Sequence, residues 1–155
     1  MDIRVIAVGR RMPGWVASAW EEYHRRLPPS IRLELVEVAP EGRQGIAPAK
    51  AMAGEAARIQ SARRRDALLV ALDERGKHFS SRDFARRLQD SSSVGQPLDV
   101  MIGGPDGIDP ALRAQASESW SLSAMTLPHA MVRVLLVEQI YRGWSIIENH
   151  PYHRE

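Results

Sequence analysis

Hydrophobic and polar positions along this chain of 155 residues follow two patterns in turn. Short runs that are mostly apolar predict strands, and longer segments with apolar residues at helical spacing predict helices between them. The expected strands are residues 3–9, 31–38, 67–72, 98–102 and 120–122. The expected helices are residues 15–27, 49–65, a segment capped by Ser80 or Ser81, 110–118, and a long helix after Pro128.

This order, a strand followed by a helix five times over, predicts an α/β fold. We expect a mainly parallel sheet with helices on both faces, because strands that alternate with helices pair in parallel. The alternation of residues 31–38 slips at Leu35 and Val36, so this strand is expected near an edge of the sheet. The length, with 44% apolar and 26% charged residues, is typical of a single soluble domain over residues 1–155.

The long helix after Pro128 is apolar around most of its circumference. Its apolar residues are Met131, Val132, Val134, Leu135, Leu136, Val137, Ile140, Tyr141 and Trp144. Only Arg133, Glu138, Gln139 and Arg142 interrupt them. Such a helix is buried in a core or against a partner, and a second subunit is one candidate partner; a core helix with a frayed tail is the alternative. Thr126 or His129 is expected to cap the helix, and Pro128 suits its first turn.

Three unusual loops follow the third, fourth and fifth strands, at residues 73–77, 103–107 and 121–126. In parallel sheets, ligands bind beyond the carboxyl ends of the strands, so the three loops are expected to form one site. The glycines of 103–107 allow close approach of backbone to a ligand or a positive φ. The hydroxyls and free backbone groups of 121–126 suit an adenine edge or a ribose better than a metal.

Other kinds of site lack their sequence patterns. The glycine loop does not follow the first strand as a dinucleotide fingerprint does, and no Walker motif is present. Ser123, His129 and Asp73 offer the residue types of a hydrolase triad, but the nucleophile elbow is missing. His150 and His153 have no further ligands at metal spacing, so no metal is expected.

The amino-acid composition narrows the possible partners and the cellular location. Among 21 basic residues only Lys50 and Lys77 are lysines, which permits an RNA partner and is explained equally well by codon bias. Cysteine is absent, which fits a cytoplasmic protein without disulfides. No apolar run approaches the roughly 20 residues that cross a bilayer, and no signal peptide is expected. The arginines at 63–65 are interpreted as the last turn of a helix, where cations favour the macrodipole, or as RNA contacts.

Four segments together carry a resemblance to a known family: LDERGK (72–77), IGGPDG (102–107), SLSAMTLPH (121–129) and NHPYHRE (149–155). They resemble the bacterial ribosomal RNA large subunit methyltransferase H family, small enzymes of the SPOUT superfamily, over essentially the whole chain. The resemblance implies an α/β domain with a C-terminal trefoil knot, a homodimer, and S-adenosyl-L-methionine as cofactor. It implies methylation of N3 of a pseudouridine in 23S rRNA on assembled ribosomes.

By position, the resemblance implies a cofactor pocket lined by Leu72, Gly103, Leu122, Ser123, Ala124, Met125, Thr126 and Leu127. The N3 proton must leave, and a base or a cationic group assists such a step. The candidates for this role are Arg142, Tyr152, His153 and Arg154, with the tail expected to reach the partner subunit's pocket. Arg10, Arg11, Arg25 and Arg26 are the arginines that two copies would present to RNA.

Two alternative hypotheses for the function remain open at this point. One is a ribosome-binding module with the same fold and no catalysis, which predicts RNA binding without cofactor affinity. The other is an adenine-nucleotide-binding enzyme of flavodoxin-like topology, which predicts binding of ATP or NAD without ribosomes. The identity of the general base and the arginines that contact RNA are not determined by the sequence.

Overall fold

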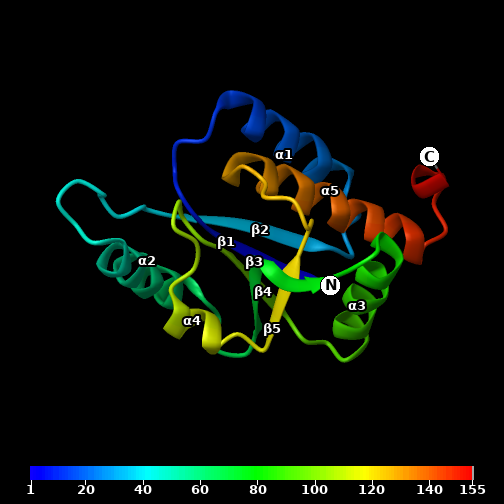
Figure 1. Cartoon of the computed structure of the whole chain (residues 1–155). Coiled ribbons are helices and arrows are strands. Elements are labelled where there is room, and N and C mark those ends of the chain that lie inside the picture. Colours follow the sequence, from blue (N-terminus) through cyan, green and yellow to red (C-terminus); the bar gives the residue numbers. More distant parts are fainter. Residues whose placement is uncertain (155) are drawn as a thin grey trace.

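A computed structural model describes residues 1–154 of the chain (Figure 1); Glu155, the last residue of the NHPYHRE motif, lies outside the described residues. The strands are β1 (Asp2–Val8), β2 (Arg32–Val38), β3 (Leu68–His78), β4 (Leu98–Ile102) and β5 (Glu118–Ser121). The helices are α1 (Gly14–Arg26), α2 (Pro48–Ala62), α3 (Ser81–Ser93), α4 (Pro110–Ala114), α5 (His129–Ile147) and the 3₁₀ helix η1 (Pro151–Arg154). The predicted alternation of strands and α-helices is confirmed.

The five strands form one sheet in the order β2-β1-β4-β3-β5, and every pairing is parallel. The predicted α/β class is therefore confirmed, and β2 lies at an edge as its broken alternation indicated. Because all strands run the same way, the loops after β3, β4 and β5 leave from one rim of the sheet. That rim is where the sequence predicts the site.

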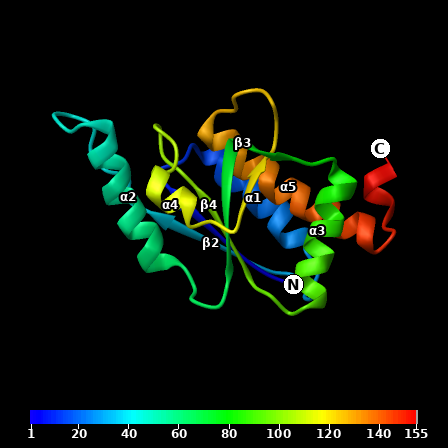
Figure 2. The same cartoon turned by 60° about the horizontal axis from the view of Figure 1, so that its bottom comes forward.

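Helices cover both faces of the sheet, as Figure 2 shows. On one face α1, α5 and α3 pack over a core that includes Val5, Val100 and Leu136. On the other face α2 and α4 pack over a second core that includes Ile6, Met101 and Ile59. Successive residues of β1 and β4 point to opposite faces, which explains why both strands are apolar at nearly every position. Within residues 1–154, no helix is long and apolar enough to cross a membrane.

The segment 73–77, which we expected to be a loop, continues as part of β3. The strand pairs with β5 through Leu72 opposite Trp120, and then again through Lys77 opposite Trp120 after a shift of register. The four residues between these pairs bulge out of the ladder and carry Asp73 to the rim. Gly76 lies against β5 so closely that an added Cβ would be 2.6 Å from the carbonyl carbon of Trp120.

The arginines at 63–65 were wrongly placed in a helix. Helix α2 ends at Ala62 with Arg63 as its C-cap, so the macrodipole account does not apply. Arg64 instead donates from Nε to Asp99 (2.9 Å) and from Nη1 to Asp2 (2.7 Å). Asp99 is fully buried on β4, and a buried carboxylate requires such a partner. A distant acid therefore determines where this arginine lies.

The cap predicted for α5 is also wrong. The helix begins at His129 with Pro128 as its N-cap, and no side chain bonds to the first turn. Thr126 instead donates a hydrogen bond from Oγ1 to Glu74 across the rim (3.0 Å). By contrast Ser80 caps α3, as predicted, by accepting from the Asp83 backbone N–H (3.1 Å).

Candidate functional site

A pocket of about 420 Å³ lies at the carboxyl rim, between the loops that follow β3, β4 and β5. Its walls include Asp73 to Arg75, Gly103 to Gly107 and much of the segment 121–127. The three loops expected to form one site therefore line one pocket. Its volume falls in the range typical of small-molecule sites.

The glycine loop after β4 is shaped by contacts within the loop itself. A Cβ added to Gly103 would lie 2.4 Å from the carbonyl carbon of Gly107, which no side chain tolerates. Gly107 has a φ of 89°, a left-handed conformation that favours glycine, and its N–H donates to the Gly104 carbonyl (3.0 Å). The positive φ expected for this loop is confirmed at Gly107, whereas the close approach at Gly103 is to the loop's own backbone and not to a ligand.

The loop between β5 and α5 is held by its own hydroxyls. Ser121 donates from Oγ to the Ser123 carbonyl (2.8 Å), and the Met125 N–H donates to Ser123 Oγ (2.9 Å). These bonds leave Leu122 and Leu127 half-buried against the pocket, with Met125 76% exposed at its mouth. Seven of the eight predicted cofactor residues line the pocket; Ala124 is exposed and does not.

Asp73 supplies a fixed negative charge at the pocket wall. Its carboxylate accepts from the Arg75 backbone and side chain (2.9 and 3.1 Å) and from Arg113 on α4 (3.2 Å). Hydrogen bonds from Arg75, which outweigh the opposing effect of burial, lower the pKa of Asp73 to about 2. The group is ionised at any ordinary pH, which suits a hydrogen-bond acceptor and excludes a general acid.

His129 and Arg133 form a polar cluster at the start of α5. Arg133, 1% exposed, donates from Nη2 to the carbonyls of Val8 (3.1 Å) and Gly9 (2.7 Å) and from Nη1 to Glu37 (2.5 Å). His129 lies 3.2 Å from the same Nη2 and lines the pocket; burial, and then the Arg133 charge, lower its pKa. A neutral imidazole therefore accepts from Arg133, and the cluster fixes the pocket wall to the ends of β1 and β2.

The four catalytic candidates gather at the opposite end of α5. Tyr152 donates from its hydroxyl to Glu138 (3.0 Å), and the Arg142 guanidinium lies 4.9 Å from the Tyr152 ring. His153 lies on the same short helix with Nδ1 3.5 Å from Ser145 Oγ, and Arg154 is exposed there. Burial, with the hydrogen bonds that its hydroxyl donates to Tyr23 and Glu138, raises the pKa of Tyr152, so its phenol stays protonated and acts as a donor.

Glu138 belongs to this cluster, although it is not among the site residues predicted from the sequence. Its carboxylate accepts from Tyr152, from Arg142 Nε (2.8 Å) and from Gln139 Nε2 (2.6 Å). The hydrogen bond to Glu138 raises the pKa of Arg142. The one available signal was the spacing of Glu138 and Arg142 by four residues, which places them on one face of a helix.

The pocket and the tail are separated along α5. The helix has 19 residues and therefore extends about 28 Å, with the pocket at its first turn and the tail packed beyond its last. Figure 1 shows the C-terminus at the far end of α5 from the loop that precedes it. The structure thus brings the cofactor set together and the catalytic set together, but does not join the two sets within one chain.

The four arginines that were expected to face RNA lie in two places. Arg25 and Arg26 each pair with Glu22 on α1 (3.1 and 2.5 Å), while Arg10 and Arg11 are exposed after β1. Within the part of the chain that the structure describes, no group of three His, Cys, Asp or Glu side chains is arranged to hold a metal ion.

Comparison with known proteins places this geometry in a family. A family model described as "Predicted SPOUT methyltransferase" matches residues 1–153. The ribosomal RNA large subunit methyltransferase H proteins of Burkholderia lata and Bordetella petrii are 49% and 50% identical to it, with 99% of each chain covered.

Solved structures share the fold at much lower identity. A methylase family protein from Neisseria gonorrhoeae superposes with a TM-score of 0.56 at 15% identity, over 90% of this chain and 81% of that one. Another, from Haemophilus influenzae, gives 0.57 at 13% identity, over 97% of this chain and 69% of that one. The chain belongs to the SPOUT methyltransferases and, among them, to the ribosomal RNA large subunit methyltransferase H family.

Proposed function

We propose that this protein transfers a methyl group from S-adenosyl-L-methionine to N3 of a pseudouridine in 23S rRNA of assembled ribosomes. The observation that carries the proposal is the pocket built by three rim loops in a chain so similar to the Burkholderia lata enzyme, whose name states its rRNA substrate. We propose further that residues 1–155 form one cytoplasmic domain with a C-terminal trefoil knot, which family membership supports.

The pocket's chemistry supports the cofactor. Leu72, Leu122 and Leu127 offer apolar walls to an adenine ring, and the backbone of the segment 121–127 offers hydrogen bonds to its edge. The Ser123 and Thr126 hydroxyls and the Asp73 carboxylate suit the ribose and the amino group. When bound, the cofactor supplies an electrophilic methyl group on a sulfonium, and the protein's task is to position the acceptor in line with it.

A homodimer would place the tail of one chain beside the pocket of the other, which a single chain does not do. The outward face of α5 carries Met131, 37% exposed, with Val134 and Leu135 half-buried. Trp15, 49% exposed, begins the adjacent helix α1, so apolar surface gathers near one end of the α1–α5 pair. Burying this surface against a second copy, with the tail of each chain at the partner's pocket, would bring the two separated sets of residues together.

The tail then handles the acceptor's proton. The guanidinium groups of Arg142 and Arg154 can stabilise negative charge on the base, while the Tyr152 hydroxyl, which donates to Glu138, holds the tail in place. His153 is the candidate with a lone pair able to accept the N3 proton. Glu138 positions both Arg142 and Tyr152, because its carboxylate accepts from each.

The test is methyl transfer from radiolabelled S-adenosyl-L-methionine to ribosomes from cells that lack this activity, with free rRNA in parallel. Label at one nucleotide of assembled ribosomes, and little on free rRNA, is the expected result. No label on either substrate, with no cofactor binding by calorimetry, would overturn the proposal in favour of a ribosome-binding module.

The shared site is tested by mixing two inactive variants. Thr126→Trp fills one pocket at an exposed position, and deletion of residues 152–155 removes the tail. Each mixed dimer would carry one intact pocket facing one intact tail, and about half of the dimers are mixed after random exchange, so activity should return towards about a quarter of wild type. Separate sites within each chain predict no recovery.

A further inference from the structure

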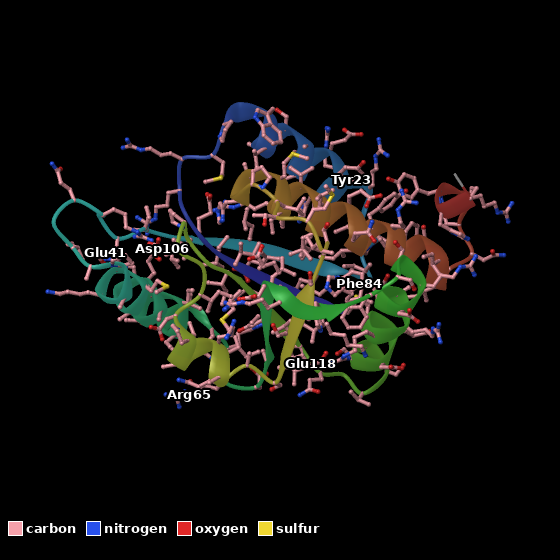
Figure 3. The ribbon with its side chains drawn as sticks, viewed as in Figure 1. Tyr23, Glu41, Arg65, Phe84, Asp106 and Glu118 are labelled. Atoms are coloured by element: carbon pink, nitrogen blue, oxygen red, sulfur yellow. The ribbon has the colours of Figure 1, made fainter. Side chains whose placement is uncertain are left out.

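The loop between β2 and α2, residues 39–47, is fastened to the glycine loop of the pocket by one arginine. Arg43 donates from Nε to Asp106 Oδ2 (2.8 Å) and from Nη1 to Glu55 Oε1 (2.7 Å). A third bond, again from Nη1, reaches the Glu41 carbonyl (2.7 Å). Figure 3 shows Glu41 and Asp106 at the same end of the molecule, where the two loops meet.

Glu55 holds the loop 39–47 by accepting two hydrogen bonds from it. It lies on α2, is 2% exposed, and accepts from the Glu41 N–H (3.0 Å) as well as from Arg43. Gly104 lies directly against it, because a Cβ added there would be 2.9 Å from Glu55 Oε2. The cluster of Arg43 and Glu55 therefore contacts the glycine loop twice, through the Asp106 carboxylate and through the backbone of Gly104.

Arg43 is not itself among the residues that line the pocket, whereas Gly104 and Asp106 are. Loss of the Arg43 guanidinium would affect the pocket because it would leave the Glu55 carboxylate without its ion pair. Without the guanidinium, Glu55 keeps a buried carboxylate whose nearest remaining donor is the Glu41 backbone, and a buried charge without its partner is unfavourable. The simplest relief is for the loops on either side of Glu55 to open to water, and one of those is the glycine loop.

We infer that Arg43 is a positioning residue for the cofactor pocket, acting through Glu55 and Asp106 on the loop 103–107. This inference rests on the proposed function, since it assigns the pocket to S-adenosyl-L-methionine. The inference goes beyond the proposed function, because it makes the order of the loop 39–47 and the affinity for cofactor depend on each other. The reciprocal effect follows from linkage: bound cofactor should order the loop 39–47.

The chain offers a matched control in Arg58. This residue also holds the loop, by donating to the Ala39 carbonyl (3.0 Å) and pairing with Glu41 (2.8 Å), but neither bond touches the glycine loop. Arg43→Gln and Arg58→Gln each remove one positive charge and the guanidinium contacts that hold the loop 39–47. Only the first removes contact with residues 103–107.

The experiment uses two readouts on the full-length protein. Calorimetry with S-adenosylhomocysteine should show a Kd raised about tenfold by R43Q and within about twofold of wild type for R58Q. Amide hydrogen exchange of the ligand-free protein should be faster in residues 103–109 for R43Q only. R43K, which keeps the charge and loses the fork that reaches two carboxylates, should lie between R43Q and wild type.

The outcomes separate this inference from the proposed function. If wild type binds S-adenosylhomocysteine while R43Q and R58Q bind it equally well, Arg43 has no positioning role. If wild type does not bind it, the cofactor assignment fails, and the exchange of residues 103–109 still decides whether Arg43 orders that loop. Should R43Q fail to fold, R43K against R58Q provides the same comparison, and equal Kd and exchange would overturn the inference.

Discussion

The hydroxyl of Tyr152 donates a 3.0 Å hydrogen bond to Glu138, joining the C-terminal 3₁₀ helix to the outward face of α5. The two residues are 14 positions apart, and the bond holds the tail against a helix whose other end forms the pocket. The tail is thereby kept in a defined place, at the end of α5 opposite the pocket of its own chain.

Tyr152→Phe should lower methyl transfer at least tenfold while the Kd for cofactor stays within about twofold, because misplacement of a group near the reacting atoms costs rate rather than cofactor affinity. Tyr23→Phe is the matched control. Its hydroxyl lies 3.5 Å from that of Tyr152, so it makes only a long contact with the tail. Equal loss of transfer and of cofactor binding in Y152F would contradict the positioning role.

Arg133→Met should reduce the free energy of unfolding by about 3–5 kcal/mol, measured by urea denaturation, since it leaves the Val8 and Gly9 carbonyls without this donor in the interior. Arg25→Met, which breaks an exposed pair with Glu22, should change it by less than about 1 kcal/mol. If R133M does not fold, R133K provides the weaker form of the test. A loss no greater than that of R25M would show that the buried bonds contribute little.

Gly103→Ala should abolish cofactor binding and destabilise the fold by roughly 2–4 kcal/mol, since its Cβ meets the Gly107 backbone at 2.4 Å. Gly42→Ala is the control, because no atom lies within 4 Å of a Cβ added there. Thermal unfolding and calorimetry of the two variants check the prediction. An alanine at 103 with normal affinity would mean that the loop adapts to it freely.

Asp73 should stabilise the fold in a pH-dependent way. Its pKa is about 2 in the folded protein against an ordinary value near 3.8, so the stabilisation is fully present above about pH 5 and is lost as pH falls towards 2. Because Arg75 is 68% exposed and screened by water, we expect about 1–2 kcal/mol rather than the full value of the shift. The difference in urea stability between wild type and Asp73→Asn should fall to about half between pH 7 and pH 3. A constant difference would contradict this account.

The order of elements and the location of the pocket were predictable because both depend on local patterns. Apolar runs such as Leu98–Ile102 mark buried strands, and parallel strands bring their loops to one rim. The sheet order β2-β1-β4-β3-β5 was not predicted, since nothing in a single apolar strand states which neighbour it pairs with.

The misses share one physical cause, a partner far away in sequence. Arg133 was read as a break in an apolar helix, but its acceptors, Glu37, Val8 and Gly9, lie 96 to 125 residues earlier. Arg64 was assigned to a helix end, whereas Asp99 holds it 35 residues away. Glu138 was overlooked because its role depends on Tyr152 folding back over α5. Periodicity reports burial well for apolar side chains and poorly for paired charges.

The placement of β5 and α5 has a consequence for biosynthesis. They are the last strand and the last α-helix in the described chain, yet α5 covers the centre of one face of the sheet and the loop before it closes the pocket. While a ribosome is still making the chain, only α1 and α3 are available to cover that face, because domains acquire their elements from the N-terminus. The pocket is therefore complete only once the chain has been synthesised past residue 132, the last of the described residues that line it. A nascent chain stalled before that point would present exposed apolar surface to chaperones and proteases and would lack a complete pocket.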